Sequence, residues 1–201
     1  MRVNLEPVDG PWKIIWKSKA PLRVAFFVWT SVLGKILTMD NLCKKNIIVT
    51  EWCCTCKKRG ESIDHLLVHC EVALEVWNMV CQLFGVMWVM SGSLKECLGS
   101  WRGQGGNRTV LQIWRMAPLC VMWCLWRERN GRSFEDRELE IIELKKKVLQ
   151  TLFSWRVLWH SSQVSMLAKF LDFCVFFKLK ASFCRLFLYI SCIHGLRPLR
   201  F

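Results

Sequence analysis

The stretch from Trp52 to Cys70 reads WCCTCKKRGESIDHLLVHC and holds four cysteines and two histidines. Cys53 and Cys56 are separated by two residues, the spacing of a zinc knuckle, in which a tight turn points two thiolates at one ion. His65 and Cys70 follow about one helical turn apart, so a helix can present both to the same ion. Four nitrogen and sulfur ligands fill the tetrahedron that Zn²⁺ prefers and leave no position for water. The spacing predicts one structural zinc ion at residues 52–70, held by Cys53, Cys56, His65 and Cys70.

Two further residues in this stretch leave the ligand set open. Cys54 can replace Cys53, and His69 follows His65 by four residues, which places both imidazoles on one face of a helix. A set of Cys54, Cys56, His65 and His69 has Cys-x-Cys spacing, which makes a poorer knuckle. The alternative without a metal is a group of buried Cys and His side chains around a helix, and the density of ligand residues favours the ion.

The composition restricts the class of protein. The chain has 201 residues, of which 53% are hydrophobic, with 12 Trp and 12 Phe, so a sizeable core can form and general disorder is excluded. Mean hydropathy is only +0.23, and the longest charge-free stretch, 76–94, contains polar residues and glycines, which argues against a membrane protein. The first residues form no secretory signal, so we expect a nuclear or cytoplasmic protein that is not secreted, whose isolated cysteines are core residues rather than disulfide partners.

Hydrophobic periodicity predicts a mainly α fold: a helical domain with a small zinc-knuckle insert and an apolar, helical C-terminal tail. The expected helices cover residues 22–37, 40–45, 63–70, 74–84, 108–128 and 134–159. Pro118 is expected to kink the fifth of them, and Ser133 with Asp136 resembles a capping box that opens the last. Short strands are expected only at 47–49 and 52–53. The tail, residues 161–201, has six Lys and Arg but a single acidic residue.

Basic side chains accompany the knuckle and the helices before it, in a chain with a formal net charge of +13. Such side chains can form a face toward phosphates, and the accompanying tryptophans suit base stacking, so we expect RNA or single-stranded DNA to be bound with little sequence specificity. The candidate nucleic-acid-binding residues are Lys17, Lys19, Arg23, Lys44, Lys45, Lys57, Lys58 and Arg59.

No catalytic constellation is visible in the sequence. It contains no GxxxxGK[ST] loop, no GxGxxG after a strand and no GxSxG elbow. Carboxylates are sparse, and no pair is placed to hold two metal ions for phosphoryl transfer. We therefore predict a protein that is not an enzyme, with no small-molecule substrate and no membrane partner.

Further motifs surround the knuckle. Trp-Lys-x-Lys-x-Pro occurs at 16–21, a Phe- and Trp-rich helix at 26–29, Leu-Thr-Met at 37–39 and Glu-Ser-x2-His-Leu at 61–66, and the series ends at Trp77. Together they resemble the zinc-binding domain that follows the reverse transcriptase in plant LINE-type (non-LTR) retrotransposons. The match is close over residues 11–80 and looser to about 158. It implies the ligands Cys53, Cys56, His65 and Cys70, and a domain over 11–158 followed by a divergent tail over 161–201.

The resemblance also implies hypotheses about the function. No polymerase palm or endonuclease precedes the zinc domain, so the chain resembles a detached C-terminal piece of such an element. The first hypothesis is a non-catalytic structural zinc module that binds nucleic acid and helps the polymerase engage RNA or target DNA. The alternatives are a zinc-stabilised protein-interaction domain that packs on the polymerase domain of the reverse transcriptase, and a non-functional remnant. The Pro and Gly that the family usually has around the knuckle are absent, and Lys57 follows Cys56.

Overall fold

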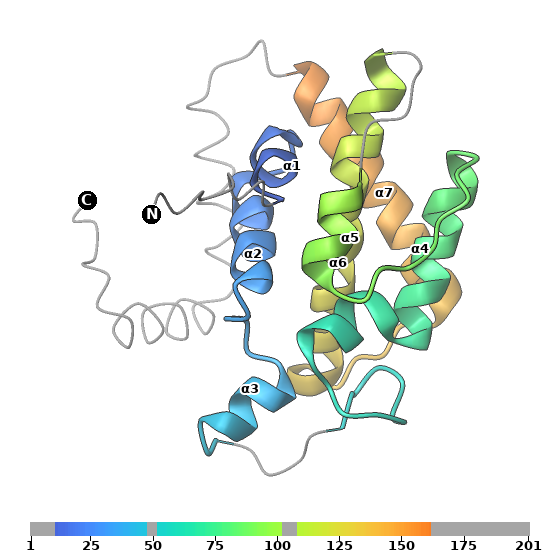
Figure 1. Cartoon of the computed structure of the whole chain (residues 1–201). Coiled ribbons are helices and arrows are strands. Elements are labelled where there is room, and N and C mark those ends of the chain that lie inside the picture. The colour runs from blue at the N-terminus through green and yellow to red at the C-terminus, as the bar shows by residue number, and fades with distance from the viewer. Residues whose placement is uncertain (1–10, 48–51, 102–107, 162–201) are drawn as a thin grey trace, which may run out of the picture. The chain divides into compact units, whose positions relative to one another are not determined.

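The structure is a computed structural model that describes residues 11–47, 52–101 and 108–161 (Figure 1). It confirms a mainly α fold, in which the described residues contain no strand and a single antiparallel bridge joins Trp52 to Gly60. Two compact units divide the chain after Val157, and the side-chain contacts described below lie in the first, Met1–Val157. The helices are α1 (Trp12–Lys17), α2 (Leu22–Val32), α3 (Met39–Lys44), the π-helical turn η1 (His65–His69), α4 (Glu71–Leu83), α5 (Leu94–Ser100), α6 (Arg108–Phe134) and α7 (Ile141–Ser161).

The core of the domain is built around α6, which contacts α1, α2, α4 and η1 (Figure 1). By length and composition α6 is also apolar enough to span a membrane, but 56% of its most apolar window is buried within the protein. We therefore interpret α6 as a core helix. The isolated cysteines Cys81, Cys97, Cys120 and Cys124 are all buried, as expected for small core side chains.

A tryptophan cluster compensates for the proline in α6. Pro118 has no N–H, so the carbonyl of Trp114, four residues earlier, lacks its usual helical donor. The indole Nε1 of Trp101 donates to this carbonyl at 3.0 Å, and the two rings stack with centroids 4.1 Å apart. Trp77 packs on the same group with its ring 5.5 Å from Trp101. The three side chains are fully buried and fasten α4 and the end of α5 to the middle of α6.

Several predicted boundaries need correction. The helix after Pro21 ends at Val32 rather than at residue 37, because the chain reverses at Gly34 with φ of +73°. Helix α4 begins at Glu71, and the short helices α1 and α5 were not predicted from the sequence. Of the predicted strands, 47–49 lies largely outside the described residues, and 52–53 contributes only the isolated bridge. The predicted C-terminal tail also lies outside them.

The predicted start of the last helix is wrong. Ser133 lies inside α6, which continues to Phe134, and α7 begins only at Ile141. Asp136 adopts a left-handed φ of +48°, which a residue in the first turn of a helix does not have. The carbonyl of Gly131 accepts from the backbone N–H groups of Glu135 and Arg137, so the chain turns back at the end of α6 instead of starting a new helix.

Candidate metal centre

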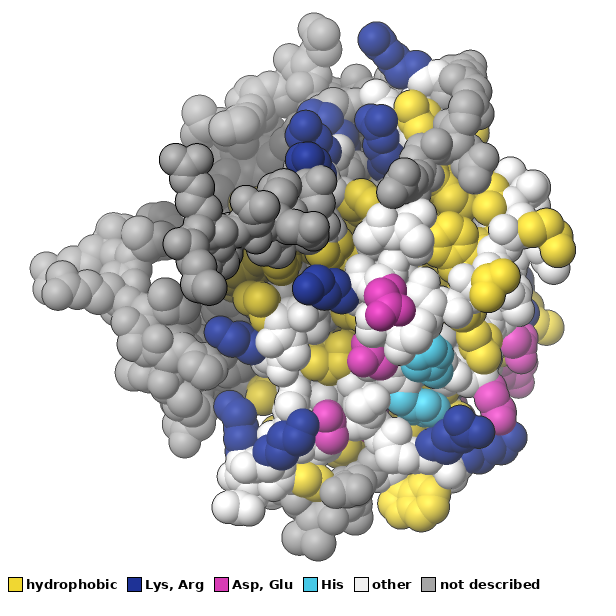
Figure 2. Space-filling model, viewed as in Figure 1, with side chains coloured by type: hydrophobic (Ala, Val, Ile, Leu, Met, Phe, Trp, Pro, Cys, Tyr) yellow, Lys and Arg dark blue, Asp and Glu magenta, His cyan; other side chains and the backbone are white. Residues whose placement is uncertain are grey.

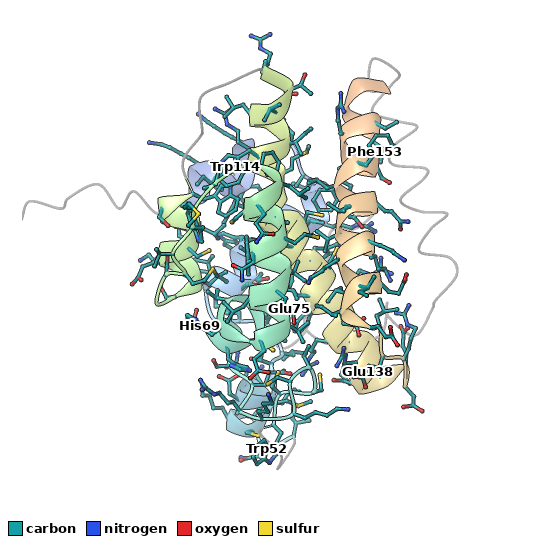
Figure 3. All side chains as sticks on the ribbon, turned by 90° about the vertical axis from the view of Figure 1, so that its right-hand side faces the viewer. Trp52, His69, Glu75, Trp114, Glu138 and Phe153 are labelled. Carbon is teal, nitrogen blue, oxygen red and sulfur yellow. The ribbon has the colours of Figure 1, made fainter. Side chains whose placement is uncertain are left out.

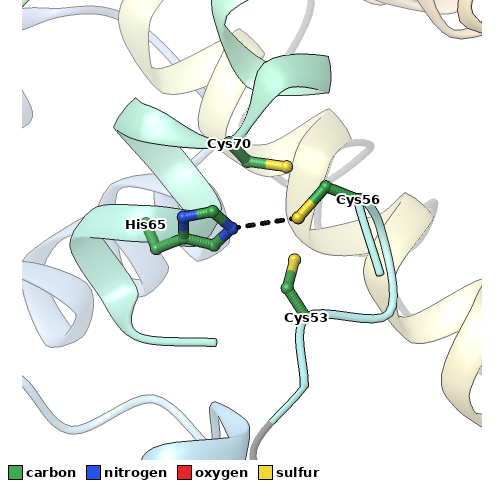
Figure 4. Close-up of side chains that lie close together, drawn as sticks. All are labelled: Cys53, Cys56, His65 and Cys70. Atoms are coloured by element: carbon green, nitrogen blue, oxygen red, sulfur yellow. Dashed lines mark hydrogen bonds between the residues drawn. The ribbon is translucent and has the colours of Figure 1, made fainter. Parts of the chain in front are cut away.

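The structure brings together the four residues whose spacing predicted a metal site (Figure 4). The ligand atoms of Cys53, Cys56, His65 and Cys70 all lie within 4.8 Å of one another, and Cys56 Sγ is 3.3 Å from His65 Nε2. A tetrahedron with metal–sulfur bonds of about 2.3 Å has edges of roughly 3.8 Å. Cys53 and Cys70 are fully buried, while Cys56 and His65 are half-buried. The donor set and its size therefore fit a tetrahedral ion with four protein ligands.

A tight turn positions the first two cysteines. The N–H of Cys53 donates to the carbonyl of Arg59, and the carbonyl of Cys53 accepts from the N–H of Lys57, both at 2.8 Å. Lys57 adopts φ of +57°, the left-handed conformation that glycine tolerates best. The turn thus has the closed geometry of a knuckle, although a lysine occupies the strained position.

A π-helical turn positions the other two ligands. Cys70 follows His65 by five positions, and on an α-helix this spacing would point the two side chains about 140° apart. In η1 the N–H of Cys70 donates to the carbonyl of His65 at 2.6 Å, an i to i+5 bond that widens the turn. The wider turn brings Cys70 round to the side of His65. The indole of Trp77 donates to the carbonyl of Leu67 at 2.9 Å and so satisfies a group within the widened turn.

Hydrogen bonds favour a thiolate at Cys53. The Cys70 thiol donates to Cys53 and lowers the pKa of Cys53, and the backbone N–H groups of Cys56 and Thr55 lower it further, while burial acts in the opposite direction. The same contact and burial raise the pKa of Cys70. One sulfur of the buried pair therefore carries the negative charge that a cation would meet.

The two alternative ligands point elsewhere. Cys54 Sγ lies 3.5 Å from Ser133 Oγ, 3.7 Å from the carbonyl of Arg129 and 3.8 Å from a carboxylate oxygen of Glu61. His69 Nε2 lies 3.1 Å from the carbonyl of Gly92. The structure thus does not bring the set of Cys54, Cys56, His65 and His69 together.

The knuckle lies within a segment that matches a known family. Residues 1–77 match the family model described as zinc-binding in reverse transcriptase. Over these residues the chain is similar to zinc-binding domains of reverse transcriptases. The resemblance that the motifs indicated is thereby confirmed.

The chain is also similar to a curated plant protein. The chain is 26% identical over 122 residues to a protein of Arabidopsis thaliana named "Putative ribonuclease H protein", and the match covers 61% of this chain. The chain spans about a fifth of that protein, since the match covers 20% of its length. No solved structure matches the chain.

Sequence reasoning missed a layer of charged residues behind the knuckle. Glu61 and Arg129 form an ion pair at 2.9 Å whose side chains are 0% and 1% exposed. Glu128 and Arg132 form a second pair at 2.8 Å, with Glu128 also buried. Three of these residues lie in the charged stretch Arg127–Arg132, which interrupts an otherwise apolar helix, and that interruption is the signal that sequence reasoning could have used.

The predicted nucleic-acid-binding residues are all exposed but fall into three groups. One group lies on α1, α2 and the turn between them, one at the end of α3 and its C-terminal cap, and one in the loop of the knuckle. Figure 2 shows basic side chains in separate groups on the face that it presents. Three of the lysines form exposed ion pairs: Lys44 with Asp40, Lys57 with Glu138 and Lys58 with Glu71. The guanidinium of Arg23 lies 5.7 Å from the Trp123 ring.

Proposed function

We propose that this chain is a non-catalytic module in which one Zn²⁺ ion, held by Cys53, Cys56, His65 and Cys70, stabilises the fold. The convergence of four nitrogen and sulfur ligand atoms within 4.8 Å, inside the segment that matches the family, carries the proposal. When bound, zinc would cross-link the knuckle to η1 and contribute its binding free energy to folding. A set of four protein ligands leaves no coordination position for substrate water, so the role is structural.

The carboxylates support a role without catalysis. Glu61, Glu128 and Glu138 each pair with an arginine near the end of α6. Carboxylates that serve two catalytic metal ions must instead be free to bind the ions.

The zinc proposal is tested by metal content and unfolding of the full chain. We expect one zinc per chain in the wild type, and loss of zinc together with unfolding in Cys56→Ser and His65→Ala. Cys54→Ser and His69→Ala are matched controls, because these residues lie beside the site but point away from it. Retention of zinc in both ligand variants, or its loss in both controls, would contradict the ligand assignment.

We further propose that the module binds RNA or single-stranded DNA through its basic groups and an exposed tryptophan, in a nuclear or cytoplasmic setting. Trp52 is 62% exposed and directly precedes Cys53, so the knuckle holds its backbone in place. The basic run Lys57–Arg59 lies in the same loop, across the bridge from Trp52 to Gly60. In Figure 3, Trp52 lies at one end of the domain with its side chain at the surface. Base stacking on such a ring contributes about 1–3 kcal/mol per base.

The test is a titration of the zinc-loaded chain with labelled single-stranded RNA and DNA of mixed sequence. We expect log K to fall linearly with log salt concentration, with a slope of about −0.7 per neutralised phosphate. Trp52→Ala should weaken binding, whereas Phe153→Ala should not, since Phe153 is equally exposed but lies on α7 toward the other end of the domain (Figure 3). A flat salt plot, or equal effects of the two variants, would refute this mode of binding.

One observation favours a second candidate, a protein-interaction domain. On α2, Leu22 and Phe26 are 75% and 44% exposed, and Leu33 at the C-terminal cap of the helix is 40% exposed. Phe26 contacts the half-buried Trp29 at a centroid distance of 5.4 Å. Residues at these spacings share one helix face, and such an apolar face is typical of a protein contact. The family implies the polymerase domain of a reverse transcriptase as the partner. Sedimentation velocity separates the candidates, because a monomeric chain at high concentration would count against an apolar interface.

A further inference from the structure

The knuckle is fastened to the end of α6, about 55 residues beyond the family match that ends at residue 77. Arg132 makes the attachment with all three of its guanidinium nitrogens. Nε donates to Glu128 Oε1 at 2.8 Å, Nη1 to the carbonyl of Thr55 at 3.1 Å, and Nη2 to the carbonyl of Leu139 at 3.1 Å. Nη1 also donates to Glu138 Oε1 at 2.8 Å.

The carbonyl of Thr55 that Arg132 contacts belongs to the peptide group whose N–H faces the sulfur of Cys53. The carbonyl of Thr55 and the N–H of Cys56 belong to one planar trans peptide, in which they point in opposite directions. The N–H donates to Cys53, and the carbonyl accepts from Arg132. The guanidinium therefore fixes the orientation of this peptide, and its charge polarises the N–H toward the sulfur.

Glu128 in turn fixes Arg132. Its carboxylate oxygen accepts from Arg132 Nε and, at 2.9 Å, from the backbone N–H of Leu139. The Arg132 side chain is only 9% exposed and that of Glu128 only 2%, so the pair is held largely away from solvent. A planar guanidinium with several fixed donors suits this task, which an ammonium group cannot perform with the same geometry.

We propose that Arg132 is a positioning residue for the metal centre, which holds the Thr55–Cys56 peptide so that its N–H is directed at the Cys53 sulfur. This inference rests on the proposed zinc site. If it holds, a residue at the C-terminal end of α6, outside the segment that matches the zinc-binding family, orients a ligand of the metal centre. Replacement of groups that orient metal ligands typically weakens metal binding by about 10- to 100-fold.

The test compares zinc affinity among full-length variants by chelator competition under conditions in which circular dichroism shows each to be folded. Arg132→Met should weaken zinc binding by about 10- to 100-fold, and Arg132→Lys should recover only part of the loss. Glu128→Gln, which loosens Arg132 without removing it, should give a smaller loss. The matched control is Arg127→Met, because Arg127 is an exposed arginine on the same helix.

A second readout separates positioning from general stabilisation. The absorption spectrum of the Co²⁺-loaded chain depends on the geometry of the thiolate ligands and should change in Arg132→Met but not in Arg127→Met. Zinc affinities and Co²⁺ spectra equal to wild type in both Arg132 variants would overturn the inference while leaving the zinc site intact. A wild-type chain that binds no zinc would overturn the proposed function and this inference with it. Should Arg132→Met fail to fold, Arg132→Lys and Glu128→Gln decide by the same readouts.

Discussion

The buried pair of Glu61 and Arg129 gives the sharpest stability prediction. Glu61 Oε1 lies 3.0 Å from Arg129 Nε and 2.9 Å from Nη2, and it also accepts from the backbone N–H of Met39 at 3.0 Å. The guanidinium lies over the rings of Trp126 and Phe134, at 5.2 and 5.7 Å from their centroids. One carboxylate thus joins α3, the segment before η1, and α6.

Replacing only one partner leaves the other charge buried without its counter-ion. Arg129→Met should therefore lower the free energy of unfolding by roughly 3–5 kcal/mol, a large part of the total of about 5–15 kcal/mol for a domain. With an m-value of about 2 kcal/mol per molar urea, the midpoint should fall by about 2 M. Because Glu61→Gln keeps an oxygen for the Met39 N–H, the double variant should be more stable than additivity predicts by up to about 3 kcal/mol.

The assay is urea unfolding of the full chain at pH 7 with constant zinc, for wild type, both single variants and the double variant. Lys58→Met serves as the control, because its pair with Glu71 is solvent-exposed, and it should leave the midpoint unchanged. A loss below about 1 kcal/mol in Arg129→Met, or full additivity in the double variant, would refute the account of the buried pair.

Three further predictions concern single sites. Lys57→Gly should raise the free energy of unfolding by about 1 kcal/mol, because Lys57 has a left-handed φ of +57° that glycine adopts without strain. Lys58→Gly should lower the free energy of unfolding. The urea midpoint should therefore rise in the first variant and fall in the second. Trp101→Phe should lower thermal stability by about 1–3 kcal/mol, since the buried carbonyl of Trp114 loses the indole donor; a loss no larger than that of an exposed Trp→Phe change would contradict this. Burial raises the pKa of Cys97 from the ordinary thiol value of 9.0 to about 12, so the folded state holds this proton more tightly than the unfolded chain does. The stability from this group should be full below pH 9 and should fall as the pH rises from about 9 toward 12. Cys97→Val should flatten that alkaline decline in urea midpoints measured in reducing buffer, and an unchanged slope would show that this thiol is not its source.

Local signals in the sequence were sufficient for part of this architecture. Pro21 directly precedes α2, as expected for a residue whose missing N–H costs nothing there. The isolated cysteines Cys81, Cys97, Cys120 and Cys124 are all buried core residues. The first inference depends only on adjacent residues.

Distant contacts explain the errors. The capping-box pattern at Ser133 does not start a helix. Glu128 and Arg132 instead bind the N–H and the carbonyl of Leu139 in the segment after α6, and α7 begins only at Ile141. A short-range rule cannot anticipate a buried charge that binds backbone groups at a chain reversal. The pair of Glu61 and Arg129 was equally hidden, since 68 residues separate its members.

The sequence by itself indicated the kind of site, because a knuckle spacing followed by His and Cys on one helix is typical of thiolate and imidazole ligation of a metal. Tertiary structure alone decided which cysteine of the adjacent pair faces the cluster. Cys54 turns to Glu61, Ser133 and the Arg129 carbonyl, which leaves Cys53 with Cys56. The physical reason is that neighbouring residues in a turn point in different directions, and the side facing α6 is fixed by buried charges that the chain brings from far away.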